Sequence, residues 1–309
     1  MFVSLFLIGY IIGSLSNSSV NVETYFTPAI LENSLQENFA IFLVVIIFSS
    51  PKNFERRQVI RNTWLLTKGN NNIKHYFAIG VSSLDNEQLV SLKEEYKSYE
   101  DLLLLYSFRD SYSRLSEKLL EVFKWIDKNV QYRFILKVDD DTFVQIDALS
   151  KALAKLPPKR LYWGFFDGQA NVKTRGKWKE KNWFLCDRYL PYAKGGGYVL
   201  SKDLVHLIVS VSNYLTMYQN EDVSLGTWLA PFSVKRVHEP NFDTEFQSRG
   251  CLNSYLITHK QTISMMEQKY KSLQESGNIC SSEHTVRNSY VYNWNVPPSR
   301  CCSRNENVP

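Results

Sequence analysis

The strongest constraint on this chain is a run of three aspartates, Asp139, Asp140 and Asp141, directly after the apolar residues 132–138 (YRFILKV). The apolar residues have the content of a buried strand. Three adjacent carboxylates repel one another, and a divalent cation with oxygen ligands relieves that repulsion. In an open α/β sheet, ligands bind at the carboxyl ends of the strands. The pattern predicts a cation-assisted ligand site here, and a solvated acidic turn is the alternative.

Apolar runs and helical patterns alternate through the N-terminal half. Strands are predicted at residues 39–48, 75–81, 102–106 and 132–138, and helices at residues 53–64, 86–97 and 111–128. This alternation predicts an α/β domain with a mainly parallel sheet flanked by helices.

The second half of the chain is more mixed. Strands are predicted at residues 161–166, 198–200, 233–238 and 255–259, and helices from about residue 202, from about residue 221 and over residues 261–274. Three glycines at residues 195–197 are interpreted as a tight turn that lets the backbone approach a ligand.

The N-terminus predicts a separate segment. Residues 1–15 are apolar and uncharged but shorter than the ~20 residues of a bilayer span, and the first basic residue of the chain is Lys52. A signal-like segment, a membrane anchor and a truncated start are the alternatives. Residues 16–38 are predicted to be a stem or linker, and residues 39–309 a single domain.

Charge and cysteine content narrow the classes of function. The net charge is +5 without a dense Lys/Arg block, which argues against a nucleic acid partner and suits an anionic small substrate. The five cysteines include no CxxC pair, so a structural zinc site is not expected. An odd count leaves at least one thiol outside any disulfide within the chain, and the sequence leaves the pairing open.

Two further groups of residues can carry chemistry. Glu221 and Asp222 begin a predicted helix, where a carboxylate can accept a proton from a hydroxyl, although acidic residues also favour helix N-termini for dipole reasons. His238 and His259 each end a strand-like segment and are candidate metal ligands, with a structural role as the alternative.

Arg57 and Arg61 lie four residues apart on one predicted helix face. They can pair with a phosphate or with a nearby carboxylate. A solvated basic face is the third possibility.

Several ordered motifs together resemble the β1,3-glycosyltransferase family of the animal Golgi. The resemblance runs from about residue 39 to the C-terminus. It rests on residues 57–64 (RQVIRNTW), 77–80 (FAIG), 101–125 (with DSYSRLSEK at 110–118), 137–143 (KVDDDTF), 162–164 (YWG), 191–201 (PYAKGGGYVLS) and 221–223 (EDV). Residues 164–166, 185–187, 249–251 and 290–302 are similar to members that build the linkage region of proteoglycans.

The resemblance implies a GT-A type fold, with a Rossmann-like sheet and an acceptor-binding C-terminal half. It implies an inverting galactosyltransferase that uses Mn²⁺ and UDP-galactose and transfers galactose to the 3-hydroxyl of galactose-β1,4-xylose on a core protein. It also implies a single-pass type II membrane protein in the Golgi lumen. A β1,3-N-acetylhexosaminyltransferase and a non-catalytic carbohydrate-binding protein on the same fold are the alternatives.

The resemblance further implies roles for individual residues. Asp222 is the expected general base, and Asp141, Asp139 and His259 the expected metal ligands, with His238 as the alternative histidine. The expected donor-binding residues are Arg57, Arg61, Lys137, Asp139 and Asp140. The expected acceptor-binding residues are Trp163, Tyr192, Gly196, Gly197 and Glu221.

Overall fold

The computed structural model describes residues 41–66 and 72–309. The expected apolar segment at residues 1–15 and the stem at residues 16–38 lie outside these ranges. Within them, no helix combines the length and the apolar character that a bilayer crossing requires.

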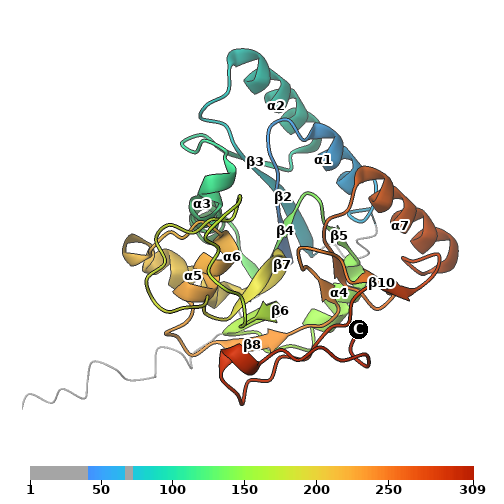
Figure 1. The fold of residues 1–309 in the computed structure, drawn as a ribbon. Helices are drawn as coiled ribbons and strands as arrows, with labels where there is room; N and C mark the ends of the chain where they lie inside the picture. The colour runs from blue at the N-terminus through green and yellow to red at the C-terminus, as the bar shows by residue number, and fades with distance from the viewer. Residues whose placement is uncertain (1–40, 67–71) are drawn as a thin grey trace, which may run out of the picture. The chain divides into compact units, whose positions relative to one another are not determined.

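The core of the protein is a seven-stranded mixed sheet with the order β3-β2-β1-β4-β7-β6-β8 (Figure 1). Its strands are β1 (Ile41–Phe48), β2 (Ile73–Gly80), β3 (Leu102–Leu105), β4 (Tyr132–Asp139), β6 (Leu161–Asp167), β7 (Tyr192–Ser201) and β8 (Lys235–His238). Strands β3, β2, β1 and β4 are parallel, and β7 is antiparallel to β4 and β6. This arrangement confirms the predicted α/β fold with a mainly parallel sheet.

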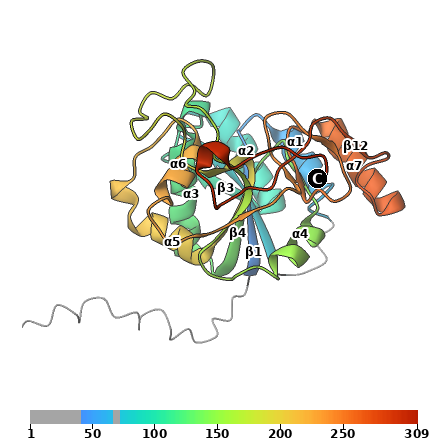
Figure 2. The ribbon, with the colours of Figure 1, turned by 60° about the horizontal axis from the view of Figure 1, so that its bottom comes forward.

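Helices cover the sheet, so its central strands are buried on both faces. They are α1 (Phe54–Arg61), α2 (Asn86–Tyr99), α3 (Leu115–Asn129), α4 (Ile146–Leu153), α5 (Lys202–Ser210), α6 (Glu221–Trp228) and α7 (Ile263–Ser276). In both ribbon views α3, α5 and α6 gather on one side, and α1, α4 and α7 on the other (Figures 1 and 2). Helix α4 was not among the predicted elements.

Strand β7 corrects the expectation that three glycines break the chain. Gly195, Gly196 and Gly197 lie inside the extended strand, and none has a positive φ. A Cβ at Gly196 would lie 2.5 Å from Nδ1 of His259, and a Cβ at Gly195 would lie 2.8 Å from Oε1 of Glu221. The glycines therefore let neighbouring side chains approach the strand, which explains their place in a strand that sequence rules disfavour.

A small second sheet brings distant segments to the end of β4. It consists of β5 (Phe143–Val144), β11 (Ile257–Thr258) and β9 (Phe242–Asp243). Strand β11 lies within the strand predicted at residues 255–259, whereas β5 and β9 are too short for sequence periodicity to reveal. The Gln261 amide donates to the carbonyl oxygen of Asp141 at 2.8 Å. His259 is thereby fixed beside the three aspartates.

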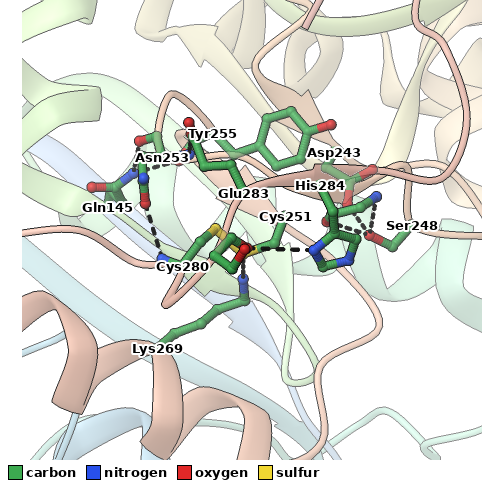
Figure 3. Close-up of a disulfide and its surroundings, with 12 residues drawn as sticks. Gln145, Asp243, Ser248, Cys251, Asn253, Tyr255, Lys269, Cys280, Glu283 and His284 are labelled. Carbon is green, nitrogen blue, oxygen red and sulfur yellow. Dashed lines mark hydrogen bonds between the residues drawn. A yellow bond between two sulfur atoms is a disulfide. The ribbon is translucent and has the colours of Figure 1, made fainter.

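The disulfide between Cys251 and Cys280 closes the segment that carries His259 and α7 (Figure 3). It joins β10 (Gly250–Cys251) to the chain after α7, and β10 pairs with β12 (His284–Thr285). The side-chain carbonyl of Asn253 accepts a hydrogen bond from the Cys280 amide at 2.9 Å. A second disulfide joins the adjacent Cys301 and Cys302, and the exposed Cys186 is the free cysteine, as the odd count requires.

Arg57 and Arg61 form a buried ion-pair network with carboxylates, so the structure decides between the three possibilities open from the sequence. Arg57 donates to both oxygens of Glu95, at 2.8 and 2.7 Å, and its Nη1 donates to the Ser50 carbonyl at 2.7 Å. Arg61 donates to both oxygens of Asp101 and to Glu95. Because carboxylates already pair with these guanidinium groups inside the fold, we expect the arginines to support a donor site through the framework and not by direct contact with phosphate.

Replacing Glu95 with glutamine is expected to destabilise the protein strongly. The change removes the charge that compensates two buried guanidinium groups, and breaking a buried pair in this way costs about 3–5 kcal/mol. The free energy of unfolding from urea denaturation measures the loss. Glu94→Gln, at an exposed position of the same helix, is the control and should change it by less than about 0.5 kcal/mol. Equal stability of the Glu95 and Glu94 variants would contradict this account.

Candidate active site

The carboxyl ends of β1, β2 and β4 open into a cleft of about 1220 Å³. β2 and β3 extend the sheet on one side of β1, and β4 lies on the other side, so the order in which strands are added changes between β1 and β4. Open α/β sheets bind their ligands at such a point. The lining includes Ser49 and Asn53 after β1, Gly80 at the end of β2, residues 110–112 before α3, and Asp139, Asp140 and Asp141 at the end of β4. The predicted acidic site therefore lies in a large cleft at the carboxyl ends of the central strands.

Asp139, Asp141 and His259 converge at one edge of this cleft. One potential ligand atom of each lies within 4.8 Å of the others. Nε2 of His259 is 2.9 Å from Oδ1 of Asp141 and 3.4 Å from Oδ2 of Asp139. The structure thus brings together the three residues expected as metal ligands, although they are far apart in the sequence.

The carboxylates of Asp139 and Asp141 lie close together, so their negative charges need a positive charge beside them. Burial lowers the pKa of His259, but hydrogen bonds to Asp139 and Asp141 outweigh it and raise that pKa to about 9. The Lys260 ammonium lies 3.1 Å from Asp141 and 3.1 Å from Nε2 of His259. A divalent cation can replace the imidazole proton and supply positive charge at the same place. Two carboxylates and an imidazole are a suitable ligand set for such an ion.

Asp140 points to a different part of the cleft. Its Oδ2 accepts hydrogen bonds from the hydroxyl of Ser49 and from the side-chain amide of Asn53, both at 2.8 Å. Asn53 directly precedes α1, but its side chain makes no capping bond. Asp140 therefore fixes the segment between β1 and α1, which forms the floor of the cleft.

Lys137 connects the metal-ligand cluster to the second acidic element. Its ammonium is buried and donates to Oδ1 of Asp139 at 2.7 Å, to Oε1 of Glu221 at 2.7 Å and to the Gly195 carbonyl at 2.8 Å. Burial disfavours the charged amine, but the two carboxylates outweigh it and raise the pKa of Lys137. Glu221 is buried as well, so this network holds β4, β7 and α6 together.

Asp222 lies beside this network with a carboxylate suited to accept a proton. Its Oδ2 accepts from the Gly195 amide at 2.9 Å and its Oδ1 from the Val223 amide at 2.8 Å. Burial, followed by the negative charge of Glu221, raises the pKa of Asp222 to about 7. A carboxylate with a pKa near neutrality can act as a general base.

Two predicted functional residues are structural instead. Trp163, expected to contact an acceptor, is only 1% exposed, packs against Phe242 and donates its indole N–H to Glu239. His238 accepts from the Phe166 amide and donates to the Tyr290 carbonyl, and burial lowers its pKa to about 4. Both ring nitrogens are therefore occupied, and His238 is not part of the metal-ligand cluster.

Of the other expected acceptor residues, Tyr192 lies near Asp222, whereas Gly196 and Gly197 lie beside other side chains. The Tyr192 ring is largely buried, and its hydroxyl is 3.4 Å from the Lys194 ammonium. Gly196 and Gly197 are buried in β7, where they face His259 and Ile257. Their roles in acceptor binding stay predictions.

Sequence reasoning did not single out two residues that shape the cleft. Lys118 is buried and donates to the Ser49 carbonyl at 2.7 Å and to Asp110 at 2.8 Å. Asp110 in turn accepts from the Gly80 amide at 3.1 Å. The pair thus joins the ends of β1 and β2. The sequence signal that could have identified the two residues is their place at the ends of the motif at residues 110–118.

Comparison with known proteins adds independent information. The sequence model of the galactosyltransferase family matches residues 55–240. The chain is 48% identical to mouse beta-1,3-galactosyltransferase 6 over 274 residues, covering 87% of this chain and 84% of that protein. It is 31% identical to UDP-GalNAc:beta-1,3-N-acetylgalactosaminyltransferase 2 of Xenopus tropicalis over 208 residues, 66% of this chain and 41% of that protein.

Among solved structures, a mannosyltransferase from Pyrobaculum calidifontis in complex with GDP-Man and Mn²⁺ aligns with 64% of this chain and 54% of its own. The TM-score is 0.38 and the sequence identity is 9%.

Replacing Asp141 with asparagine is expected to weaken divalent cation binding by about tenfold or more, because a charged ligand becomes neutral. Mn²⁺ titration followed by electron paramagnetic resonance measures the affinity. Asp187→Asn, at an exposed position outside the cluster, is the matched control and should bind as the wild type does. Unchanged affinity in the Asp141 variant would exclude Asp141 as a ligand.

Proposed function

The chain belongs to the galactosyltransferase family, and on this basis we propose that it is an inverting, Mn²⁺-dependent β1,3-galactosyltransferase. The proposed donor is UDP-galactose. The proposed acceptor is the 3-hydroxyl of galactose-β1,4-xylose on a core protein, in the linkage region of proteoglycans. The 48% identity to mouse beta-1,3-galactosyltransferase 6 over most of both chains supports the choice of sugar and linkage.

The observation that carries the proposal is the link, through Lys137, between a cation-binding cluster and a carboxylate with a near-neutral pKa. Asp139 and Glu221 both contact the Lys137 ammonium, and Asp222 follows Glu221 directly. Transfer from a nucleotide sugar needs these two kinds of group close together. The cation at the cluster holds the diphosphate that leaves, and the carboxylate takes the proton of the hydroxyl that attacks.

On the donor side, we assign the 1220 Å³ cleft to the nucleotide sugar. Asp139, Asp141 and His259 would hold Mn²⁺, which supplies charge that stabilises the diphosphate as it departs. Asp140 lies beside the segment after β1 and lines the same cleft, so it remains a proposed donor contact. Arg57, Arg61 and Lys137 act through the protein framework in this proposal, because their charged groups are occupied by carboxylates.

On the acceptor side, Asp222 takes the proton from the 3-hydroxyl as that oxygen forms a bond to the anomeric carbon of galactose. The bond from that carbon to the UDP oxygen breaks in the same displacement, so an α-linked donor gives a β-linked product. The Gly195 and Val223 amides hold the carboxylate in place for the transfer. Glu221 keeps its charge paired with Lys137 and raises the basicity of Asp222.

We further propose residues 39–309 as the catalytic domain and residues 16–38 as a stem. The proposed location is the Golgi lumen, with residues 1–15 in a type II anchor or signal segment. The Cys251–Cys280 disulfide suits an oxidising compartment of this kind.

The purified protein is expected to form a β1,3-linked trisaccharide from UDP-galactose and a galactosyl-β1,4-xyloside. Excess EDTA should abolish the product and added Mn²⁺ should restore it, because the cluster at Asp139, Asp141 and His259 lacks its cation without them. Product analysis by mass spectrometry and linkage-specific digestion makes the measurement. A donor panel tests the N-acetylgalactosaminyl alternative raised by the 31% identical relative. Preference for a UDP-N-acetylhexosamine would overturn the galactosyl assignment.

The variant Asp222→Asn is expected to lose turnover by a factor of about 100 or more, because the amide cannot accept the proton. Binding of UDP and Mn²⁺ should stay near wild type, which calorimetry can establish on the same protein. In the wild type, kcat/KM should fall as the pH falls through about 7, because protonation inactivates the base. A variant that retains most of its turnover, or a wild-type profile that rises at lower pH, would argue against Asp222 as the base.

A further inference from the structure

A turn between β6 and β7 concentrates positive charge. Five of the nine residues from 173 to 181 are basic, namely Lys173, Arg175, Lys177, Lys179 and Lys181, and all five are exposed. The expectation that the chain has no dense Lys/Arg block is therefore wrong for this short segment. Figure 2 shows the loop between β6 and β7 extending beyond α6.

The backbone holds these like charges close together. The Glu180 amide donates to the Lys173 carbonyl at 2.7 Å, and the Lys179 amide donates to the Gly176 carbonyl at 3.1 Å. Gly176 has a φ of +74°, a left-handed conformation that favours glycine at this tight point. The turn is thus a defined structure and not an extended tail over which the charges can spread.

No nearby carboxylate neutralises the turn. Glu180 is buried, and its oxygens accept hydrogen bonds from the amides of Lys181, Asn182 and Gln219. Across residues 41–66 and 72–309, no carboxylate forms an ion pair with any of the five basic side chains. Clustered unpaired cations attract a polyanion and speed its association.

The turn is attached to the segment that carries the proposed base. The Gln219 amide donates to Glu180 at 2.8 Å, and the side-chain amide of Asn220 donates to the Trp178 carbonyl at 3.3 Å. Gln219 and Asn220 directly precede Glu221 and Asp222. The turn is therefore attached to the residues that directly precede Glu221 and Asp222.

On its other side, the turn meets the wall of the donor cleft. The Lys177 ammonium lies 4.5 Å from the centre of the Tyr112 ring, and both residues line the cleft. The other four basic residues of the turn are not part of the cleft lining. Most of this charge is consequently placed for a ligand other than the donor diphosphate.

Exposed apolar side chains follow the turn directly in the chain. Phe184 is 76% exposed and Leu185 is 43% exposed. The neighbouring Trp183 is fixed by ring contacts with Tyr189 and Tyr218. Cations beside exposed apolar groups suit a polypeptide, which offers both carboxylates and apolar side chains, better than they suit a uniformly polar polysaccharide.

We propose that residues 173–185 bind an acidic segment of the polypeptide that carries the acceptor sugar. The proposal rests on the proposed function in one respect, namely that the acceptor is attached to a polypeptide. The surface raises the affinity for such acceptors and takes no part in the chemistry at Asp222.

The test compares three acceptors: the galactosyl-xylosyl disaccharide on a neutral small aglycone, on a peptide rich in Asp and Glu, and on the same peptide with Asn and Gln. The wild type is expected to show a KM about tenfold lower for the acidic glycopeptide than for the neutral one at low salt, with the difference lost at high salt. The variant K173Q/R175Q/K179Q/K181Q should lose this preference, with kcat on the small acceptor unchanged. It leaves Lys177 and the anchoring Glu180 intact.

The matched control is K128Q/K151Q/K155Q/K159Q, which removes the same charge from exposed positions on and near α3 and α4. It should keep the preference for the acidic glycopeptide. Three results would overturn the proposal: no preference in the wild type, an equal loss in the control, or inhibition by an anionic polysaccharide without any effect of peptide charge.

A second measurement separates this proposal from the proposed function. Fluorescence anisotropy with a labelled acidic peptide that carries no sugar reports binding directly. Binding by the wild type but not by the K173Q/R175Q/K179Q/K181Q variant supports the surface even if galactose transfer is never detected. Absence of binding together with normal galactose transfer overturns the surface alone.

Discussion

The buried ammonium of Lys137 is the interaction on which the rest of the site depends. Burying such a charge is costly unless it is paired and fully hydrogen-bonded. Lys137 meets this condition with Asp139, Glu221 and the Gly195 carbonyl, which come from β4, α6 and β7. One cation thus fixes three elements at once. It also sets the relative positions of the metal-ligand cluster and the proposed base.

The three carboxylates at the end of β4 have different sets of neighbours, although Asp139 and Asp141 share His259. Asp139 contacts Lys137, Asp140 contacts neutral Ser49 and Asn53, and Asp141 contacts His259 and Lys260. Burial raises the pKa of Asp140, whereas Lys137 and His259 outweigh burial and lower the pKa of Asp139. Three identical side chains in sequence therefore acquire three different chemical characters from the fold around them.

The sequence was sufficient to predict those features of the fold that depend on a local pattern of residues. The apolar runs of β1 and β4 and the helical period of α3 were sufficient to place the sheet and the acidic cleft. The sequence could not identify ion-pair partners that lie far apart in the chain, such as Glu95 for Arg57. Trp163 shows the same limit, because an aromatic residue beside a motif glycine suits a sugar platform as well as a core. Only its 1% exposure distinguishes the two.

Positive residues in this protein differ in function according to their exposure. Arg57, Lys118 and Lys137 are buried, and their charged groups contact carboxylates and carbonyls, so they position the cleft. The residues of the turn at 173–181 are exposed and have no carboxylate partner within the part of the chain that the structure describes. In the sequence, residue type alone does not distinguish the buried basic residues from the exposed ones. The fold assigns the first group to architecture and leaves the second free for recognition, which is why the net charge of +5 reveals little about where an anion would bind.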